Sequence, residues 1–265
     1  MDILSSPVID ISWLDLVGAA GLILLSVGIT RWQGTRLAGS FLLGGVRTVV
    51  QLTVVGYVLV YIFNVNQWYW VMAALLLMTV VATREAVGRQ DSRPSILYGI
   101  TGLSLAVGSG FTLFYVSAVV VQVEPWYNPR YTIPLFGMIV GNAMNAAALA
   151  AERLAAELSM RRGEVEAYLA LGADSAEAAR EPVRSALRAA LIPTLNSLMV
   201  VGIVALPGMM TGQILGGVSP LTAIRYQIVV MFMLAGSVTL TATLVTIGYR
   251  RRFFTTAEQL RLRPE

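Results

Sequence analysis

The segment Arg161–Pro193, RRGEVEAYLALGADSAEAAREPVRSALRAALIP, is a polar, arginine-rich stretch between two long apolar runs. Its composition favours helix throughout, and Gly172 interrupts the pattern six residues after Glu166. Asp174 and Ser175 then predict the start of a second helix, because short polar side chains cap helix N-termini. We expect an insert of this kind, in a chain that is otherwise so apolar, to be displayed to a partner.

The composition of the whole chain is that of a membrane protein. Hydrophobic residues make up 56% of the 265 residues, charged residues only 13%, and the mean hydropathy is +0.70. Average soluble domains carry about twice that share of charge. The chain is long enough for about seven membrane-crossing helices of ~20 residues each with short loops. The sequence therefore predicts an all-α, polytopic membrane protein that forms a single domain.

Apolar runs between helix breakers predict where the chain crosses the membrane. The predicted spans are about 11–30, 37–63, 68–83, 95–122, 132–152, 189–210 and 222–248. Alternate connections carry all the Arg residues except Arg47, Arg130 and Arg225. Since positive charge gathers on the cytoplasmic side, the N-terminus is expected outside and the C-terminus inside. The insert, about 153–188, then lies in the cytoplasm between spans five and six.

Three residue types are missing from the sequence, and their absence excludes several functions. All 19 basic residues are Arg, and there is no Lys, His or Cys. Without Lys the chain cannot form the phosphate-binding loop that ends in Gly-Lys-Ser/Thr. Without His and Cys it has no disulfide, thiolate nucleophile or imidazole metal ligand. We therefore expect no enzyme activity and no cofactor. The net charge of +4 needs no nucleic-acid partner, because the Arg residues already anchor the spans.

The fifth span carries two stripes at helical spacing. Gly137 and Gly141 form a small-residue face that would let another helix approach closely. Polar groups inside a bilayer need partners or water, so the neighbouring polar stripe fits either interhelical hydrogen bonds or a translocation path. The candidate path residues of this stripe are Met138, Asn142, Asn145 and Glu152.

The connection Leu206–Pro220, LPGMMTGQILGGVSP, contains two Pro and four Gly and cannot continue an uninterrupted helix. Irregular backbone at membrane depth is buried in protein or lines a cavity. A broken segment facing a translocation path is one interpretation, and an ordinary outer loop is the other. Its Met residues could offer sulfur to a metal or simply fill the core. The candidate path residues in and before this connection are Asn196, Pro207, Met209, Met210 and Gln213.

Several stretches resemble one family of permeases. Glu166-Ala167 followed by Gly172 resembles the Glu-Ala-Ala-x-x-x-Gly loop of ATP-binding-cassette permeases, with Tyr168 in place of the second Ala. Longer stretches are similar to the Fet-type iron-export permease family, which includes plant permeases linked to aluminium tolerance. These stretches are Pro134–Asn145, Leu169–Ala173, Ile192–Ser197 and Leu206–Gly217.

The resemblance implies a transmembrane permease domain over residues 1–265, placed in the cell inner membrane as a dimer and powered by a separate cytoplasmic ATPase. It implies export of iron or another metal-related substrate, and it assigns no metal ligand. Two other functions stay open for the chain: a channel or secondary transporter driven by an ion gradient, which Asp15 and Arg47 would suit, and a membrane scaffold. For the insert, a hairpin on the membrane surface stays open as the alternative to a helix that couples to the ATPase. The residues implied to couple to the ATPase are Glu166, Ala167, Leu171 and Gly172.

Overall fold

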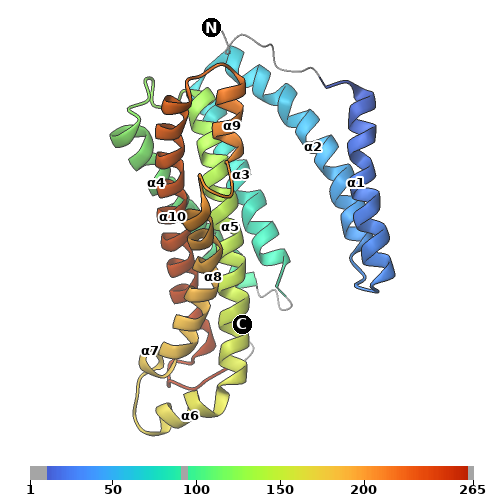
Figure 1. Cartoon of the computed structure of the whole chain (residues 1–265). Helices are drawn as coiled ribbons and strands as arrows, with labels where there is room; N and C mark the ends of the chain where they lie inside the picture. Colours follow the sequence, from blue (N-terminus) through green and yellow to red (C-terminus); the bar gives the residue numbers. More distant parts are fainter. Residues whose placement is uncertain (1–10, 91–94, 262–265) are drawn as a thin grey trace. The chain divides into compact units, whose positions relative to one another are not determined.

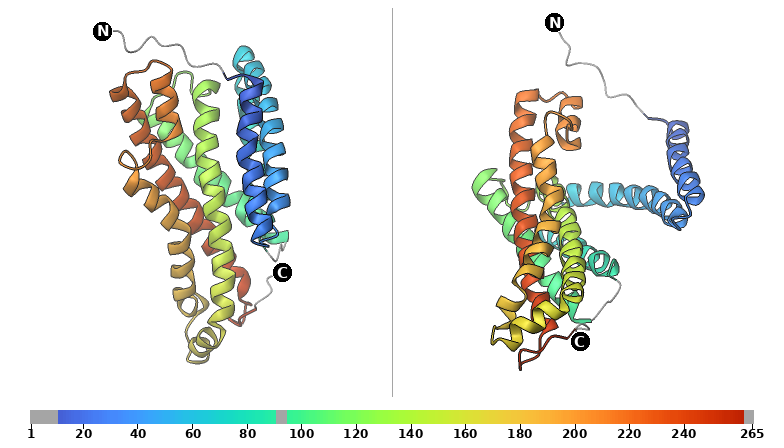
Figure 2. Two further views of the ribbon diagram at one scale, coloured as in Figure 1. Left: turned by 45° about the vertical axis from the view of Figure 1, so that its right-hand side comes forward. Right: turned by 60° about the horizontal axis from the view of Figure 1, so that its bottom comes forward.

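The computed structural model describes residues 11–90 and 95–261, and every regular element in these two ranges is a helix. β-Pairing within the described residues is limited to isolated bridges. The prediction of an all-α chain is therefore confirmed. The chain divides into two compact units (Figures 1 and 2). Unit 1 comprises Met1–Asn66 with Leu215–Gly217, and unit 2 comprises Gln67–Ile214 with Val218–Glu265.

Unit 1 is a pair of apolar helices, α1 (Trp13–Trp32) and α2 (Ala38–Val65). Asp15 closes a capping box at the start of α1, where its carboxylate accepts the Ser12 N–H at 2.9 Å. α2 ends at Asn66, whose φ of +46° places it in the left-handed region that Asn tolerates. Most side chains of both helices are exposed and apolar, as expected of helices surrounded by lipid.

Unit 2 is a helix bundle built on two long helices, α5 and α10, which pack against each other and both against α4 and α8. α3 also packs on α5. The elements of unit 2 are α3 (Trp68–Gly88), α4 (Ser95–Tyr115), the π-helical turn η1 (Val116–Val120), α5 (Pro129–Met160), α6 (Arg162–Ala170), α7 (Ser175–Ala178), α8 (Arg180–Val200), α9 (Gly208–Leu215, whose last residue belongs to unit 1), α10 (Pro220–Arg250) and the 3₁₀ turn η2 (Arg251–Phe253).

Six helical segments of the described residues are long and apolar enough to cross a membrane. They correspond to six of the seven predicted spans, and they establish a multi-pass membrane protein. These segments are Leu14–Trp32, Ala38–Val65, Trp68–Gly88, Ser95–Val120, Pro129–Met160 and Pro220–Phe253.

The predicted span 189–210 differs from the structure. α8 already ends at Val200, and the chain runs through an irregular segment before α9 begins at Gly208. Gly202 adopts a φ of +83° there, a conformation that ends a right-handed helix. The first turns of α8 also carry Arg180, Glu181, Arg184 and Arg188, so α8 as a whole is too polar to be counted among the six.

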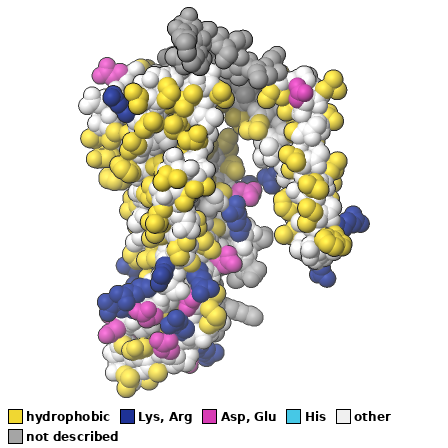
Figure 3. Space-filling model, viewed as in Figure 1, with side chains coloured by type: hydrophobic (Ala, Val, Ile, Leu, Met, Phe, Trp, Pro, Cys, Tyr) yellow, Lys and Arg dark blue, Asp and Glu magenta, His cyan; other side chains and the backbone are white. Residues whose placement is uncertain are grey.

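The two ends of unit 2 differ in charge. α6 and α7 form the turn between α5 and α8 at one end of the bundle, and α9 lies at the other end (Figure 1). Acidic and basic side chains crowd the α6–α7 end, while the visible face above it is mainly apolar (Figure 3). The insert therefore occupies a polar end of the bundle, as the sequence predicts.

Candidate functional site

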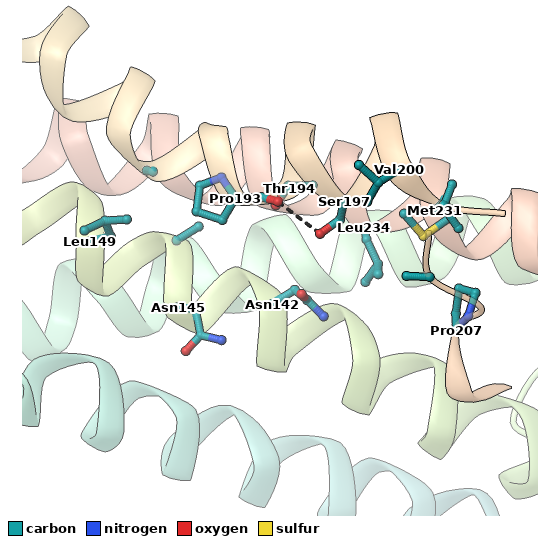
Figure 4. A pocket seen from close by; sticks show the side chains of 14 residues that line it. Asn142, Asn145, Leu149, Pro193, Thr194, Ser197, Val200, Pro207, Met231 and Leu234 are labelled. Atoms are coloured by element: carbon teal, nitrogen blue, oxygen red, sulfur yellow. Dashed lines mark hydrogen bonds between the residues drawn. The ribbon is translucent and has the colours of Figure 1, made fainter. Parts of the chain in front are cut away.

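A cavity of about 400 Å³ lies within unit 2, between α5, α8, α10 and the irregular segment that follows α8. Its walls are largely apolar, and four polar residues from two helices are among those that line it (Figure 4). Asn142 and Asn145 come from α5, and Thr194 and Ser197 come from α8. The remaining lining residues are Ala146, Leu149, Ala190, Pro193, Val200, Val201, Ala205, Pro207, Met231 and Leu234.

The α8 wall is shaped by a proline inside the helix. Pro193 has no N–H and cannot donate to the preceding turn, so the helix is weakened beside the cavity. The Ser197 hydroxyl donates to the Pro193 carbonyl at 3.0 Å, which satisfies the hydroxyl without a partner from another helix (Figure 4). α8 ends three residues after Ser197. Pro207 is the last residue of the irregular segment and lines the cavity.

The α5 wall holds its two amides differently. The Asn142 side-chain NH₂ donates to the Met138 carbonyl at 2.9 Å, within its own helix. The Asn145 side-chain oxygen accepts a hydrogen bond from Arg89 Nη1 at 2.8 Å. Arg89 is the C-cap residue of α3, so a guanidinium stands beside one cavity-lining amide. The sequence did not single out Arg89, because nothing local links two residues 56 positions apart.

Three of the predicted path residues line this cavity, and six do not. Asn142, Asn145 and Pro207 are on its surface. Among the others, Met138 and Met209 pack against the apolar core formed by α3, α4, α5 and α10, and the side-chain oxygen of Gln213 is buried without a hydrogen-bond partner. The predicted path residues outside the cavity lining are Met138, Glu152, Asn196, Met209, Met210 and Gln213.

The cavity carries no charged side chain among its lining residues. Within the described part of the chain, no group of three or more carboxylates is placed to hold a metal ion. The oxygens that the cavity offers belong to amides and hydroxyls. Such groups suit a hydrated, chelated or organic solute better than a bare cation, which favours several carboxylate oxygens.

Gly172, in the insert, ends α6 through a Schellman motif. Its N–H donates to the Leu169 carbonyl at 3.0 Å, and the Ala173 N–H donates to the Tyr168 carbonyl at 3.0 Å. The φ of Gly172 is +91°, a conformation that favours glycine because it has no Cβ. In the structure Gly172 therefore terminates the short helix α6.

The end of α6 presents an exposed apolar tip. Leu171 is 86% exposed and Tyr168 is 48% exposed, and Ala167, directly before Tyr168, is also exposed. Glu166 is also exposed and pairs with Arg162 on the same helix at 2.7 Å. A leucine this exposed on a polar surface has no role in the fold of unit 2, and exposed apolar groups commonly mark contact surfaces.

The base of the insert is packed into the body of unit 2. Val165 of α6 and Ala178 of α7 belong to one core with Leu154 and Leu158 of α5 and Ala186 of α8. The same core includes residues from the last turns of α10, so it joins these four elements to that helix. The insert is thus attached to the bundle through its buried face, while its tip stays free.

A buried carboxylate joins α5 to α8 beside this core. Glu157 is 3% exposed and accepts hydrogen bonds from Ser185 Oγ at 2.8 Å and from Arg161 Nε at 2.9 Å, and it pairs with Arg153. The hydrogen bond to Glu157 raises the pKa of Arg161, which keeps the guanidinium charged. The sequence did not single out Glu157, although the spacing Arg-x-x-x-Glu-x-x-x-Arg marks it on a helix.

These features define a multi-pass, all-helical membrane protein with a polar insert at one end and a cavity among its helices. Residues 13–254 match the uncharacterised protein family UPF0014, and the chain belongs to that family. The predicted relation to Fet-type permeases is confirmed, since known members include such a protein.

Three relatives illustrate the range of the family. The UPF0014 membrane protein slr1647 of Synechocystis is 41% identical over 95% of this chain and 97% of its own length. Protein ALUMINUM SENSITIVE 3 of Arabidopsis thaliana is 40% identical over 90% of this chain and 86% of its own. The probable iron export permease protein FetB of Escherichia coli is 33% identical over 90% of this chain and 91% of its own length. No solved structure gives a significant match.

Proposed function

We propose that this chain is the permease subunit of an ATP-binding-cassette transporter that exports iron or another metal-related substrate. A separately encoded cytoplasmic ATPase supplies the energy, since a chain without Lys has no phosphate-binding loop of its own. Two permease chains and two ATPase subunits assemble in the cell inner membrane. The similarity to the probable iron export permease of Escherichia coli supports both the class and the cargo.

The insert is the observation that carries the proposal. Its tip is exposed at the polar end of unit 2, while its base shares a core with α5 and α8. α8 leads directly from that core to the cavity, because eight residues separate Ala186 from Thr194, or ~12 Å of helix. A displacement of the tip by an ATPase would therefore reach the cavity wall through packed helices.

The residues of the tip take separate roles in docking. Leu171 and Ala167 supply the apolar contact with the ATPase, and Glu166 supplies a polar contact at its edge. Gly172 turns the chain away after Leu171, so that the leucine projects from the end of α6. This assignment agrees with the exposure of all three side chains.

A seventh crossing completes the topology. The second half of α8 and α9 together form a broken span around the irregular segment, which places the N-terminus outside and the C-terminus inside. The Arg-rich α6–α7 end supports a cytoplasmic position for the insert. Trp126 and Tyr127, before α5 begins, then lie at the outer interface, where aromatic side chains are enriched.

The cavity is proposed as part of the translocation path, with Asn142, Asn145 and Pro207 on its surface. The other six predicted path residues join it when the helices move during transport. Because the cavity offers amide and hydroxyl oxygens without a carboxylate, a chelated or hydrated metal fits it better than a bare ion.

Leu171→Asp tests the docking surface. A charge at this exposed tip should not disturb the fold, but it should weaken binding of the ATPase subunit and raise cellular iron content under iron load. Met160→Asp is the matched control, since Met160 is 66% exposed and lies at the end of α5, outside α6. Equal ATPase binding by both variants and the parent chain would remove the coupling role of α6. Unchanged iron content in cells that lack the protein would point to another cargo.

A further inference from the structure

The chain beyond α10 folds back on itself as a tight hairpin, residues 253–261. The Thr255 N–H donates to the Gln259 carbonyl at 2.9 Å, and the Arg261 N–H donates to the Phe253 carbonyl at 2.6 Å. The Thr255 hydroxyl also accepts the Gln259 N–H at 3.1 Å, which fixes the turn. The hairpin is therefore a defined element of the structure that continues directly from η2.

This C-terminal hairpin is attached to the insert by a polar and an apolar contact. The Glu258 carboxylate accepts the Ser175 N–H at 2.7 Å, across 83 positions of sequence. Phe253 is 2% exposed and belongs to the same core as Val165 of α6, and Leu260 packs against that core. The C-terminal segment lies at the α6–α7 end of unit 2 in both views (Figures 1 and 2).

The hairpin is equally well attached to α10. Phe253 packs edge-on against Tyr249, with ring centroids 4.9 Å apart. Tyr249 is itself buried in the last turn of α10. Phe253 thus contacts the last turn of α10 and belongs to the same core as the insert.

The backbone of Glu258 lies in the left-handed region, which is unfavourable for glutamate. Its φ is +57°, where a side chain with a Cβ costs about 1–2 kcal/mol and where glycine or asparagine is expected. Strain of this kind persists when the side chain makes a contact that the alternatives cannot make. In this structure the contact is the hydrogen bond from Ser175 to the carboxylate.

We infer that the C-terminal hairpin is a clasp that fixes the insert to α10, with Glu258 as a positioning residue for energy coupling. The cavity has two walls that must move together: α8 supplies Thr194 and Ser197, and α10 supplies Met231 and Leu234. The insert continues directly into α8, and the hairpin ties it to the end of α10 in addition to the apolar core that they share. With the clasp in place, one displacement of α6 moves both walls.

This inference rests on the function proposed above, and the experiment separates the two. The chain has no Cys, so Ser197→Cys introduces a single thiol in the cavity. Membrane vesicles containing this chain and its ATPase subunit are labelled with a water-soluble maleimide, with and without ATP. The comparison is between Glu258→Gly and Ala257→Gly, both in the Ser197→Cys background. Ala257 is an exposed neighbour in the same turn and keeps the Ser175 contact.

The clasp predicts that ATP changes the labelling rate in the Ser197→Cys chain and in Ala257→Gly, and that Glu258→Gly abolishes this change. Binding of the ATPase subunit and labelling without ATP should stay as in the parent. Glu258→Gln, which retains an oxygen acceptor, should restore part of the response. Since glycine relieves the strained φ, a purely structural role predicts an unchanged ATP response, and that result overturns the clasp alone. No ATP response in the Ser197→Cys chain itself overturns the clasp together with the proposed function.

Discussion

Gly163 of α6 and Gly172, which follows the helix, offer a matched test of how the exposed tip of α6 is held. Gly172→Ala and Gly163→Ala add the same methyl group, and an added Cβ meets no atom within 4 Å at either position. The positions differ in backbone conformation, since Gly172 has a φ of +91° and Gly163 lies within the right-handed helix. The pair therefore separates backbone strain from crowding.

The two substitutions are expected to change the stability of α6 in opposite directions. An L-residue in the left-handed region costs about 1–2 kcal/mol, so Gly172→Ala destabilises the end of α6. Gly163→Ala stabilises the helix by about 0.5–1 kcal/mol, because alanine loses less backbone entropy than glycine. The two variants should differ by about 2 kcal/mol in the free energy of opening α6. A difference of this size changes the opening equilibrium about 30-fold.

Amide hydrogen exchange over residues 162–173 of the purified protein measures that opening directly. We expect faster exchange in Gly172→Ala and slower exchange in Gly163→Ala than in the parent chain. If both substitutions change exchange in the same direction, the Schellman motif does not hold the tip and the reasoning is refuted.

Three further predictions concern packing, charge and the cavity. Gly108→Ala would place a methyl group against the Thr241 hydroxyl and 3.3 Å from the Thr241 Cα. Thermal unfolding should therefore show that the free energy of unfolding falls by about 1–3 kcal/mol. Gly110→Ala adds its methyl group to open space and should cause no such loss. Glu157→Ala removes the acceptor of Ser185 and the partner of two Arg residues, and it should lower the free energy of unfolding by about 1–3 kcal/mol. Glu164→Ala breaks the exposed Arg161–Glu164 ion pair of 3.5 Å and should lower the free energy of unfolding by less than about 1 kcal/mol. Equal losses in Glu157→Ala and Glu164→Ala would contradict a special role for the buried carboxylate. Asn145→Leu removes a polar group of the cavity wall together with its hydrogen bond from Arg89, and it should slow export of iron. Thr53→Leu, at an exposed position of α2 and outside the cavity lining, should leave export near the parent rate, and the same loss in both variants would argue against this cavity as the path.

The sequence predicts the parts of the fold that depend on composition. Apolar runs locate six of the helices, because a membrane span needs a long stretch without charge. The sequence also predicts the polar insert and the glycine that ends its first helix. Gly172 interrupts a helical pattern, and glycine adopts the positive φ found there at low cost.

The parts that the sequence does not predict depend on backbone conformation or on distant contacts. Val201–Ala205 is as apolar as a helix interior, so hydropathy extends the sixth span through it, whereas Gly202 turns the chain there. The hydrogen bonds Arg89–Asn145 and Ser175–Glu258 join residues far apart in sequence and leave no local pattern. Glu157 is an intermediate case, because its spacing from two Arg residues is visible but its burial is not.

If the exposed tip of α6 docks on an ATPase, site-specific photo-crosslinking in native membranes will capture that subunit at the tip. A photoreactive residue replaces Leu171, 86% exposed at the tip, or Trp126, 58% exposed in the loop before α5. We expect position 171 to form an adduct with a protein that contains a phosphate-binding loop, and position 126 to form none. An adduct with such a protein at position 126, or its absence at position 171 in a chain that still exports iron, would rule out docking at this tip.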